Sequence, residues 1–189
     1  MYWLKRWFIW IYRWRHCRGF GVQSPSDYSF IRYVVNEHYP YYAYDDLASK
    51  YPDLTHILRK KSELLFRIAN WIQSPSALIF SQHYVYKEYV SAGCHKTSVR
   101  LQSDYFCESI GQLTIASAAS TPEDKFMFLV SHLQDGQVLV VDDIDTNQGR
   151  KLWRSAISNE TATISFDLYY MGIVMNVDNR YKHDYIVNF

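Results

Sequence analysis

Residues 136–145 constrain the fold more than any other stretch of this chain. Four consecutive β-formers at 138–141 are typical of a strand buried on both faces, as strands of parallel sheets are. The strand ends in Asp142 and Asp143, and a helical pattern carrying Trp153 follows. In open α/β sheets, ligands lie at the carboxyl ends of the strands. Asp142 and Asp143 are therefore the candidate catalytic residues.

The second half of the chain alternates short strand patterns with helical patterns. Strands are predicted at 77–80, 99–101, 113–116 and 138–141, and helices at 122–132 and 148–157, while 84–90 is either helical or extended. Three β-rich runs follow at 161–169, 173–177 and 185–189, and we expect them to pair in antiparallel fashion. This order indicates an α/β fold, a three-layer αβα sandwich.

The first part of the chain is predicted to be helical. Ser24 or Ser26 could cap a helix over 27–38, with Pro25 near its start. An aromatic, extended connector is expected at 39–46, and a further helix at 60–72. We therefore divide the chain into an N-terminal helical extension, residues 1–60, and one compact α/β domain, residues 61–189.

A tryptophan stripe marks the N-terminal helix, which is predicted over residues 2–16. At about 100° per residue, Trp3, Trp7, Trp10 and Trp14 fall within roughly 60° of one another. Three interpretations are open: the aromatic face packs on the domain, the helix lies in a membrane interface, or it binds a protein partner. The four tryptophans are the candidate partner-binding residues.

Composition narrows the functional classes. The 20 basic and 19 acidic side chains give a net charge of +1, so no nucleic-acid partner is expected. The three cysteines lack zinc or CxxC spacing, which fits a reducing compartment. The N-terminus lacks the pattern of a signal peptide, and no apolar run reaches the ~20 residues that span a bilayer. We expect a cytoplasmic or membrane-peripheral protein.

Several segments, in order, resemble a known family. They are "RHCRGFGVQSP", "YYAYDDL", "ELLFRIANWI", "VLVVDDID…LW" and "FDLYYMGIVM". They are similar to a group of class I S-adenosylmethionine-dependent methyltransferases, common in Bacteroidetes, with an Asp-Asp-Ile-His-Trp motif after the fifth strand. The resemblance covers roughly residues 15–75 and 125–189. It implies a Rossmann-like sandwich with a mainly parallel sheet, a reversed C-terminal strand and S-adenosylmethionine as cofactor.

The cofactor loop departs from the pattern of this family. Its first strand should end in an acidic residue and a glycine-rich loop, which lets the backbone approach the cofactor closely. Here Ile79 stands in place of the acidic residue and Ser81 in place of the first glycine. By this alignment the cofactor-binding candidates are Ser81 and Gln82, together with Asp104, the nearest carboxylate to the position that would hold the ribose.

Residues at the ends of two further strands also differ from the family's pattern. The stretch 113–120 carries no carboxylate, and Asp145 and Thr146 replace the His-Trp of the motif. The resemblance, together with these departures, therefore predicts a methyltransferase-like protein whose cofactor site is degraded, which has lost S-adenosylmethionine and which acts by binding. The alternatives are an active methyltransferase with an atypical loop, and a peripheral membrane or assembly module that uses the tryptophan helix.

The acidic pair has two further interpretations. Asp142 and Asp143 could hold a divalent cation through carboxylate oxygens. Alternatively, Asp143 or Asp145 could cap the following helix. No third acidic ligand is evident and no histidine has zinc spacing, so no metal site is predicted. We interpret His83, just after the first strand, as a surface or packing residue.

Overall fold

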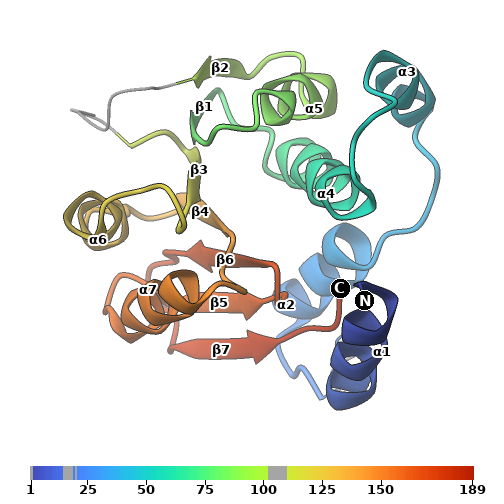
Figure 1. Ribbon diagram of the computed structural model, residues 1–189. Coiled ribbons are helices and arrows are strands. Elements are labelled where there is room, and N and C mark those ends of the chain that lie inside the picture. The colour runs from blue at the N-terminus through green and yellow to red at the C-terminus, as the bar shows by residue number, and fades with distance from the viewer. Residues whose placement is uncertain (1, 15–18, 20, 102–109) are drawn as a thin grey trace.

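The computed structural model describes residues 2–14, 19, 21–101 and 110–189, and only the backbone of residues 2, 3, 5 and 6 (Figure 1). A single sheet has the strand order β2-β1-β3-β4-β6-β5-β7. The strands are β1 (Ser76–Phe80), β2 (Ser98–Leu101), β3 (Leu113–Ser117), β4 (Val138–Asp142), β5 (Ile164–Asp167), β6 (Met171–Met175) and β7 (His183–Ile186). This mostly parallel α/β sheet is compatible with a Rossmann-like fold.

The pairing of the strands confirms one prediction and corrects another. Strand β6 is antiparallel to both β4 and β5, so it is the reversed strand near the C-terminus. Strand β7, which we expected to be antiparallel, instead pairs in parallel with β5. Strand β6 lies between β4 and β5, so one side of β5 is already paired. The following strand, β7, pairs with the other side of β5 and runs in the same direction as β5.

Helices cover both faces of the sheet (Figure 1). They are α1 (Tyr2–Arg13), α2 (Pro25–Phe30), the π-helix η2 (Ile31–Val35), α3 (Tyr42–Lys50), α4 (His56–Ile72), α5 (Val85–Gly93), α6 (Glu123–Ser131) and α7 (Asn147–Ser158). Alternate residues of β4 pack on opposite faces of the sheet. Val138 and Val140 pack in the core with α2, α4 and α5, whereas Leu139 and Val141 pack with α6 and α7. The period of two along a strand thus explains why all of 138–141 is apolar.

Several predicted helices are confirmed near their expected positions. Helix α4 begins earlier than expected, because the Thr55 side chain accepts a hydrogen bond from the Leu58 amide and caps it. Ser24 caps α2 through the Asp27 amide, as predicted. The segment 84–90, for which both conformations were open, is helical as α5.

The extended connector predicted at 39–46 is wrong, since α3 begins at Tyr42. Its aromatic residues favour a strand locally, but the fold uses them to pack a helix. Tyr44 lies edge-on to Phe66 of α4 with ring centroids 5.1 Å apart, and Leu47 is buried in the core. Tertiary packing on α4 therefore overrides the local preference.

The N-terminal helices share the core of the sheet. Phe30, Ile31 and Val34 are buried against the same face as the strand residues Ile79 and Phe166. Among the described helices, none is both long and apolar enough to cross a membrane.

Candidate functional site

The strand order places a ligand crevice at the carboxyl ends of β1 and β3. The chain passes from β1 to β2 on one side and later to β3 on the other, so the order reverses between β1 and β3. Ligands of open α/β folds bind at such a switch point. The loops after β1, β3 and β4 meet here and line a pocket of about 190 Å³. This edge is therefore the site where cofactor chemistry would be expected.

Asp142 and Asp143 lie at this edge, as predicted, but in different environments. Asp142 is the last residue of β4 and its side chain is fully buried. Asp143 follows in the left-handed region with φ 60°, and its side chain is 26% exposed and lines the pocket. Only Asp143 can therefore meet a ligand.

Lys61 of α4 forms ion pairs with both members of this acidic pair. Its Nζ lies 2.5 Å from Oδ1 of Asp142 and 3.0 Å from Oδ1 of Asp143, and its side chain is only 7% exposed. The sequence analysis missed Lys61. Its position carried a usable signal, because it stands three, four and seven residues before Leu64, Leu65 and Ile68, which places it on the buried face of the helix.

Hydroxyl groups satisfy the remaining carboxylate oxygens. The buried Tyr86 donates to Oδ2 of Asp142 at 2.5 Å, and Ser117 at the end of β3 donates to Oδ2 of Asp143 at 2.7 Å. The Asp143 amide also donates to Oδ1 of Asp142 at 2.8 Å. Each of the four oxygens thus accepts at least one hydrogen bond or faces the ammonium. We call Lys61, Tyr86, Ser117, Asp142 and Asp143 the Lys61 network.

Three members of this network, Asp143, Lys61 and Tyr86, have pKa values shifted by their surroundings. Burial opposes the charge of Asp143, but the ammonium of Lys61 and the hydrogen bond from Ser117 outweigh it, so the pKa of Asp143 is lowered. Burial likewise opposes the charge of Lys61, and the two carboxylates outweigh it and raise its pKa. Burial, and then the charge of Asp142, raise the pKa of Tyr86. Tyr86 therefore remains a neutral donor.

The two other interpretations of the acidic residues concern a metal ion and a helix cap. Within the described residues, no group of three or more histidine, cysteine, aspartate or glutamate side chains could hold a metal ion. The cap of α7 is Thr146, whose Oγ1 accepts a hydrogen bond from the Gly149 amide at 2.9 Å. The capping hypothesis for Asp143 and Asp145 is therefore wrong.

The predicted cofactor loop lies at the site but leaves little space. Ser81 and Gln82 line the small pocket, and so does His83, which we had interpreted as a surface or packing residue. The Ser81 hydroxyl accepts a hydrogen bond from the His83 amide at 3.2 Å, which tightens the loop. Asp104 lies outside the described residues. Ligand pockets for cofactor-sized molecules have volumes of about 300–1,000 Å³, and this pocket, of about 190 Å³, is smaller.

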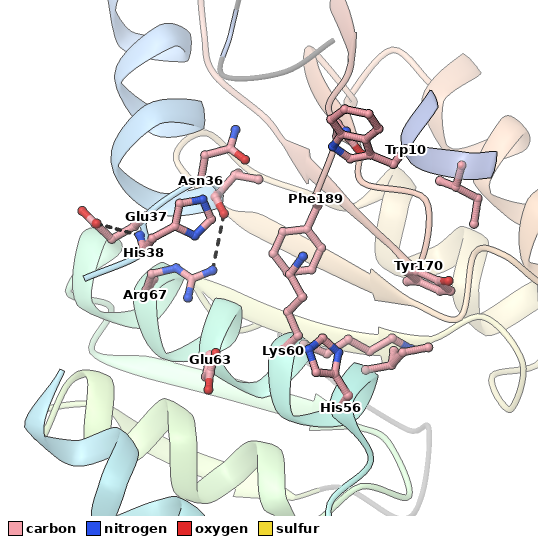
Figure 2. A pocket seen from close by; sticks show the side chains of 15 residues that line it. Trp10, Asn36, Glu37, His38, His56, Lys60, Glu63, Arg67, Tyr170 and Phe189 are labelled. Atoms are coloured by element: carbon pink, nitrogen blue, oxygen red, sulfur yellow. Dashed lines mark hydrogen bonds between the residues drawn. The ribbon is translucent and has the colours of Figure 1, made fainter. Parts of the chain in front are cut away.

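A larger pocket, of about 550 Å³, lies between α1, the end of η2, α4 and the C-terminal residues, and Lys61 and Trp10 are among the residues that line it (Figure 2). Arg67 in its wall donates to the carbonyl oxygen of Val34 at 2.6 Å and to the Tyr44 hydroxyl at 3.2 Å. Lys60 places its Nζ 4.2 Å from the centre of the Phe189 ring, and Figure 2 shows the two side chains together. The sequence patterns did not indicate this pocket.

Three tryptophans of the stripe are more than half exposed, although Trp10 also borders the larger pocket. Trp7, Trp10 and Trp14 are 58%, 55% and 57% exposed, so the interpretation that the aromatic face packs on the domain is wrong for these residues. The side chain of Trp3 and residues 15 and 16 of the predicted helix lie outside what the structure describes. Arg13, at the end of α1, is buried instead, and its guanidinium pairs with Asp167 at 2.9 Å.

No protein-family model matches the chain, and no curated protein matches it. The resemblance to methyltransferases rests on the motifs quoted above.

Proposed function

We propose that this chain is a methyltransferase-like protein that no longer uses S-adenosylmethionine and acts by binding. The Lys61 network is the observation that carries this proposal. In an open site, the carboxylates after β4 would be available to a ligand or cation. Here Lys61, Tyr86 and Ser117 occupy their oxygens from within the protein. A protein that satisfies these groups internally has no need of a ligand there.

The shape of the switch point supports the same conclusion. The loop after β1 has side chains at Ser81, Gln82 and His83, where a cofactor loop needs glycine for close approach. Tyr86, in the first turn of α5, is fully buried and reaches across to Asp142. Side chains therefore fill the space next to the switch point, and the residues present do not fit the cofactor.

The methyltransferase-like part of the proposal rests on architecture. Helices lie on both faces of a mostly parallel sheet, which suits a three-layer αβα sandwich, and the reversed strand β6 follows β5 as the resemblance implies. Fold alone does not establish activity, and the same fold hosts many functions. The rival function, an active methyltransferase, draws support from Asp143, because this carboxylate does reach the small pocket.

Calorimetric titration separates the two functions. The full chain is titrated with S-adenosylmethionine and with S-adenosylhomocysteine, each with and without Mg²⁺. We expect no binding heat at millimolar ligand. Cooperative urea unfolding of the same sample shows that the protein is folded. Binding tighter than about 100 μM, which corresponds to roughly −5.5 kcal/mol, would overturn the proposal. The variant Asp143→Asn would then tell whether the heat comes from this edge.

A further inference from the structure

Helix α1 carries a wide apolar surface on its outer side. Five of its described side chains are large, apolar, between 40% and 64% exposed and outside the lining of the larger pocket: Leu4, Trp7, Phe8, Ile11 and Trp14 just after the helix. At about 100° per residue, these positions span about 120° of the helix circumference. We call them the outer face of α1. A stripe for packing on the core of the domain would be buried, and this one is not.

Contacts on the opposite side fix the orientation of α1. Ile9 and Arg13 are four residues apart and therefore share a face. Ile9 is half-buried at the wall of the larger pocket. Arg13 donates through Nη1 to the carbonyl oxygen of Asp167 and through Nη2 to its carboxylate, both at 2.9 Å, and lies 5.3 Å from the ring centre of Tyr169.

Arg150 strengthens this anchor from the other side. Its Nη1 lies 2.6 Å from the second carboxylate oxygen of Asp167, so this carboxylate bridges two guanidinium groups. Arg13 and Asp167 are both largely buried, which makes the pair costly to break. The outer face of α1 is thus turned outward by contacts on the inner face. Figure 1 shows α1 at the edge of the molecule, beside the C-terminal end of the chain.

The positive charge of the N-terminal segment indicates which kind of partner this surface binds. Apart from Arg13, which pairs with Asp167, residues 1–18 contain four basic residues and no acidic one, although the whole chain is nearly neutral. Bulky apolar residues beside cations are typical of helices that lie in a membrane interface, and tryptophan favours the depth of the lipid headgroups. Anionic lipids attract basic segments of this kind. A second copy of the same helix would meet like charge, which disfavours self-association through α1.

We infer that α1 docks this protein on an anionic phospholipid membrane, with its outer face in the interface and Arg13 holding the helix to the domain. This names the binding partner of the non-catalytic protein proposed above, and for its biological role it rests on that proposal. A helix that binds the groove of another protein would use a narrower strip of side chains at similar spacing. The width of the outer face, together with its lack of acidic residues, favours the bilayer.

Vesicle co-sedimentation of the full chain tests this inference. The vesicles consist of phosphatidylcholine with or without phosphatidylserine. We expect binding to the anionic vesicles, weaker binding to the neutral ones and a decline with added salt. The variant Trp7→Ser/Ile11→Ser should bind at least about tenfold more weakly, because it removes two bulky side chains from the outer face.

The matched control removes two exposed aromatic side chains elsewhere. Tyr42 and Tyr181 are 99% and 88% exposed, and Tyr42→Ser/Tyr181→Ser should bind vesicles like the unmodified protein. Equal pelleting of the Trp7→Ser/Ile11→Ser variant, or no pelleting of the unmodified protein, would overturn the membrane inference. So would a dimer, seen by light scattering, that the α1 variant converts to monomer without any vesicle binding. Cofactor titration of the same samples tests the proposed function separately, so the two failures are distinguishable.

Discussion

The substitution Lys61→Met tests whether the Lys61 network holds the carboxyl edge of β4 together. Methionine keeps much of the length of the side chain and removes the charge. The Asp142 side chain is fully buried and Lys61 is 7% exposed, so the variant leaves a buried carboxylate without its cation. Removing one partner of a buried ion pair costs about 3–5 kcal/mol. This is a large part of the roughly 5–15 kcal/mol that stabilises a typical domain.

Urea unfolding measures the loss of stability. With a slope of about 2–3 kcal/mol per molar urea, the midpoint should fall by about 1–2 M. The added substitution Asp142→Asn, in the double variant with Lys61→Met, should restore part of the loss because it removes the uncompensated charge. Such recovery is the coupling expected between residues in direct contact.

The dependence of stability on pH follows from Asp143 and Lys61, whose pKa values are shifted. The folded pKa of Asp143 lies below its ordinary value of 3.8, so its contribution is present above about pH 3.8 and is lost as pH falls through the folded pKa. The folded pKa of Lys61 lies above 10.5, so its contribution is present below about pH 10.5 and is lost as pH rises through the folded pKa. The difference in stability between the unmodified protein and Lys61→Met should therefore be widest between these limits.

A surface ion pair provides the matched control. Lys50 lies 2.5 Å from Glu88, but its side chain is 56% exposed. Solvent screens an exposed pair, so Lys50→Met should shift the urea midpoint little. If Lys61→Met costs no more than Lys50→Met, the buried network does not stabilise this edge and the reasoning behind the proposed function fails.

Two further variants probe packing and the N-terminal contact. In Gly93→Ala, the new Cβ would lie 2.3 Å from the backbone oxygen of Phe66, so α4 and α5 must separate. We expect the free energy of unfolding in urea to fall by about 3 kcal/mol. Ser91→Ala is the control on the same helix, and equal stabilities of the two variants would contradict the close approach. In Tyr185→Phe, Asp27 loses a donor at 2.9 Å, which should cost about 1–2 kcal/mol. Burial and this hydrogen bond raise the pKa of Tyr185 to about 12. Its contribution to stability is therefore present below about pH 10 and is lost as pH rises through about 12. The phenylalanine variant should lack this alkaline loss of stability, and an unchanged alkaline profile would contradict the assignment.

Local patterns predicted most of the sheet. Strands β1, β3 and β4 are short apolar runs between turn signals, and such runs form buried strands with little help from distant residues. The reversed strand β6 was also predicted, and so was the placement of Asp142 and Asp143 at the carboxyl edge. This placement follows because side chains at the ends of parallel strands gather at one edge.

Distant contacts determined what the patterns missed. The local pattern of residues 39–46 favours an extended conformation. Packing of Tyr44 on Phe66 nevertheless places the residues from Tyr42 onward in helix α3. Strand β7 pairs with the outer edge of β5 because β6 occupies the other side of β5. Neither partner is near in sequence, and the energy of such contacts depends on residues that no local window contains.

The residue types and spacing alone established that an acidic pair ends a buried strand and that four tryptophans share one face of a helix. The meaning of both features depended on groups far away in the chain. Lys61, more than 80 positions before Asp143, forms ion pairs with both aspartates, and Asp167, 154 positions from Arg13, holds α1 so that Trp7 and Trp14 are exposed. Periodicity specifies which side chains share a face. Which partner that face meets depends on how the whole chain packs, because burial and charge pairing are properties of the assembled structure.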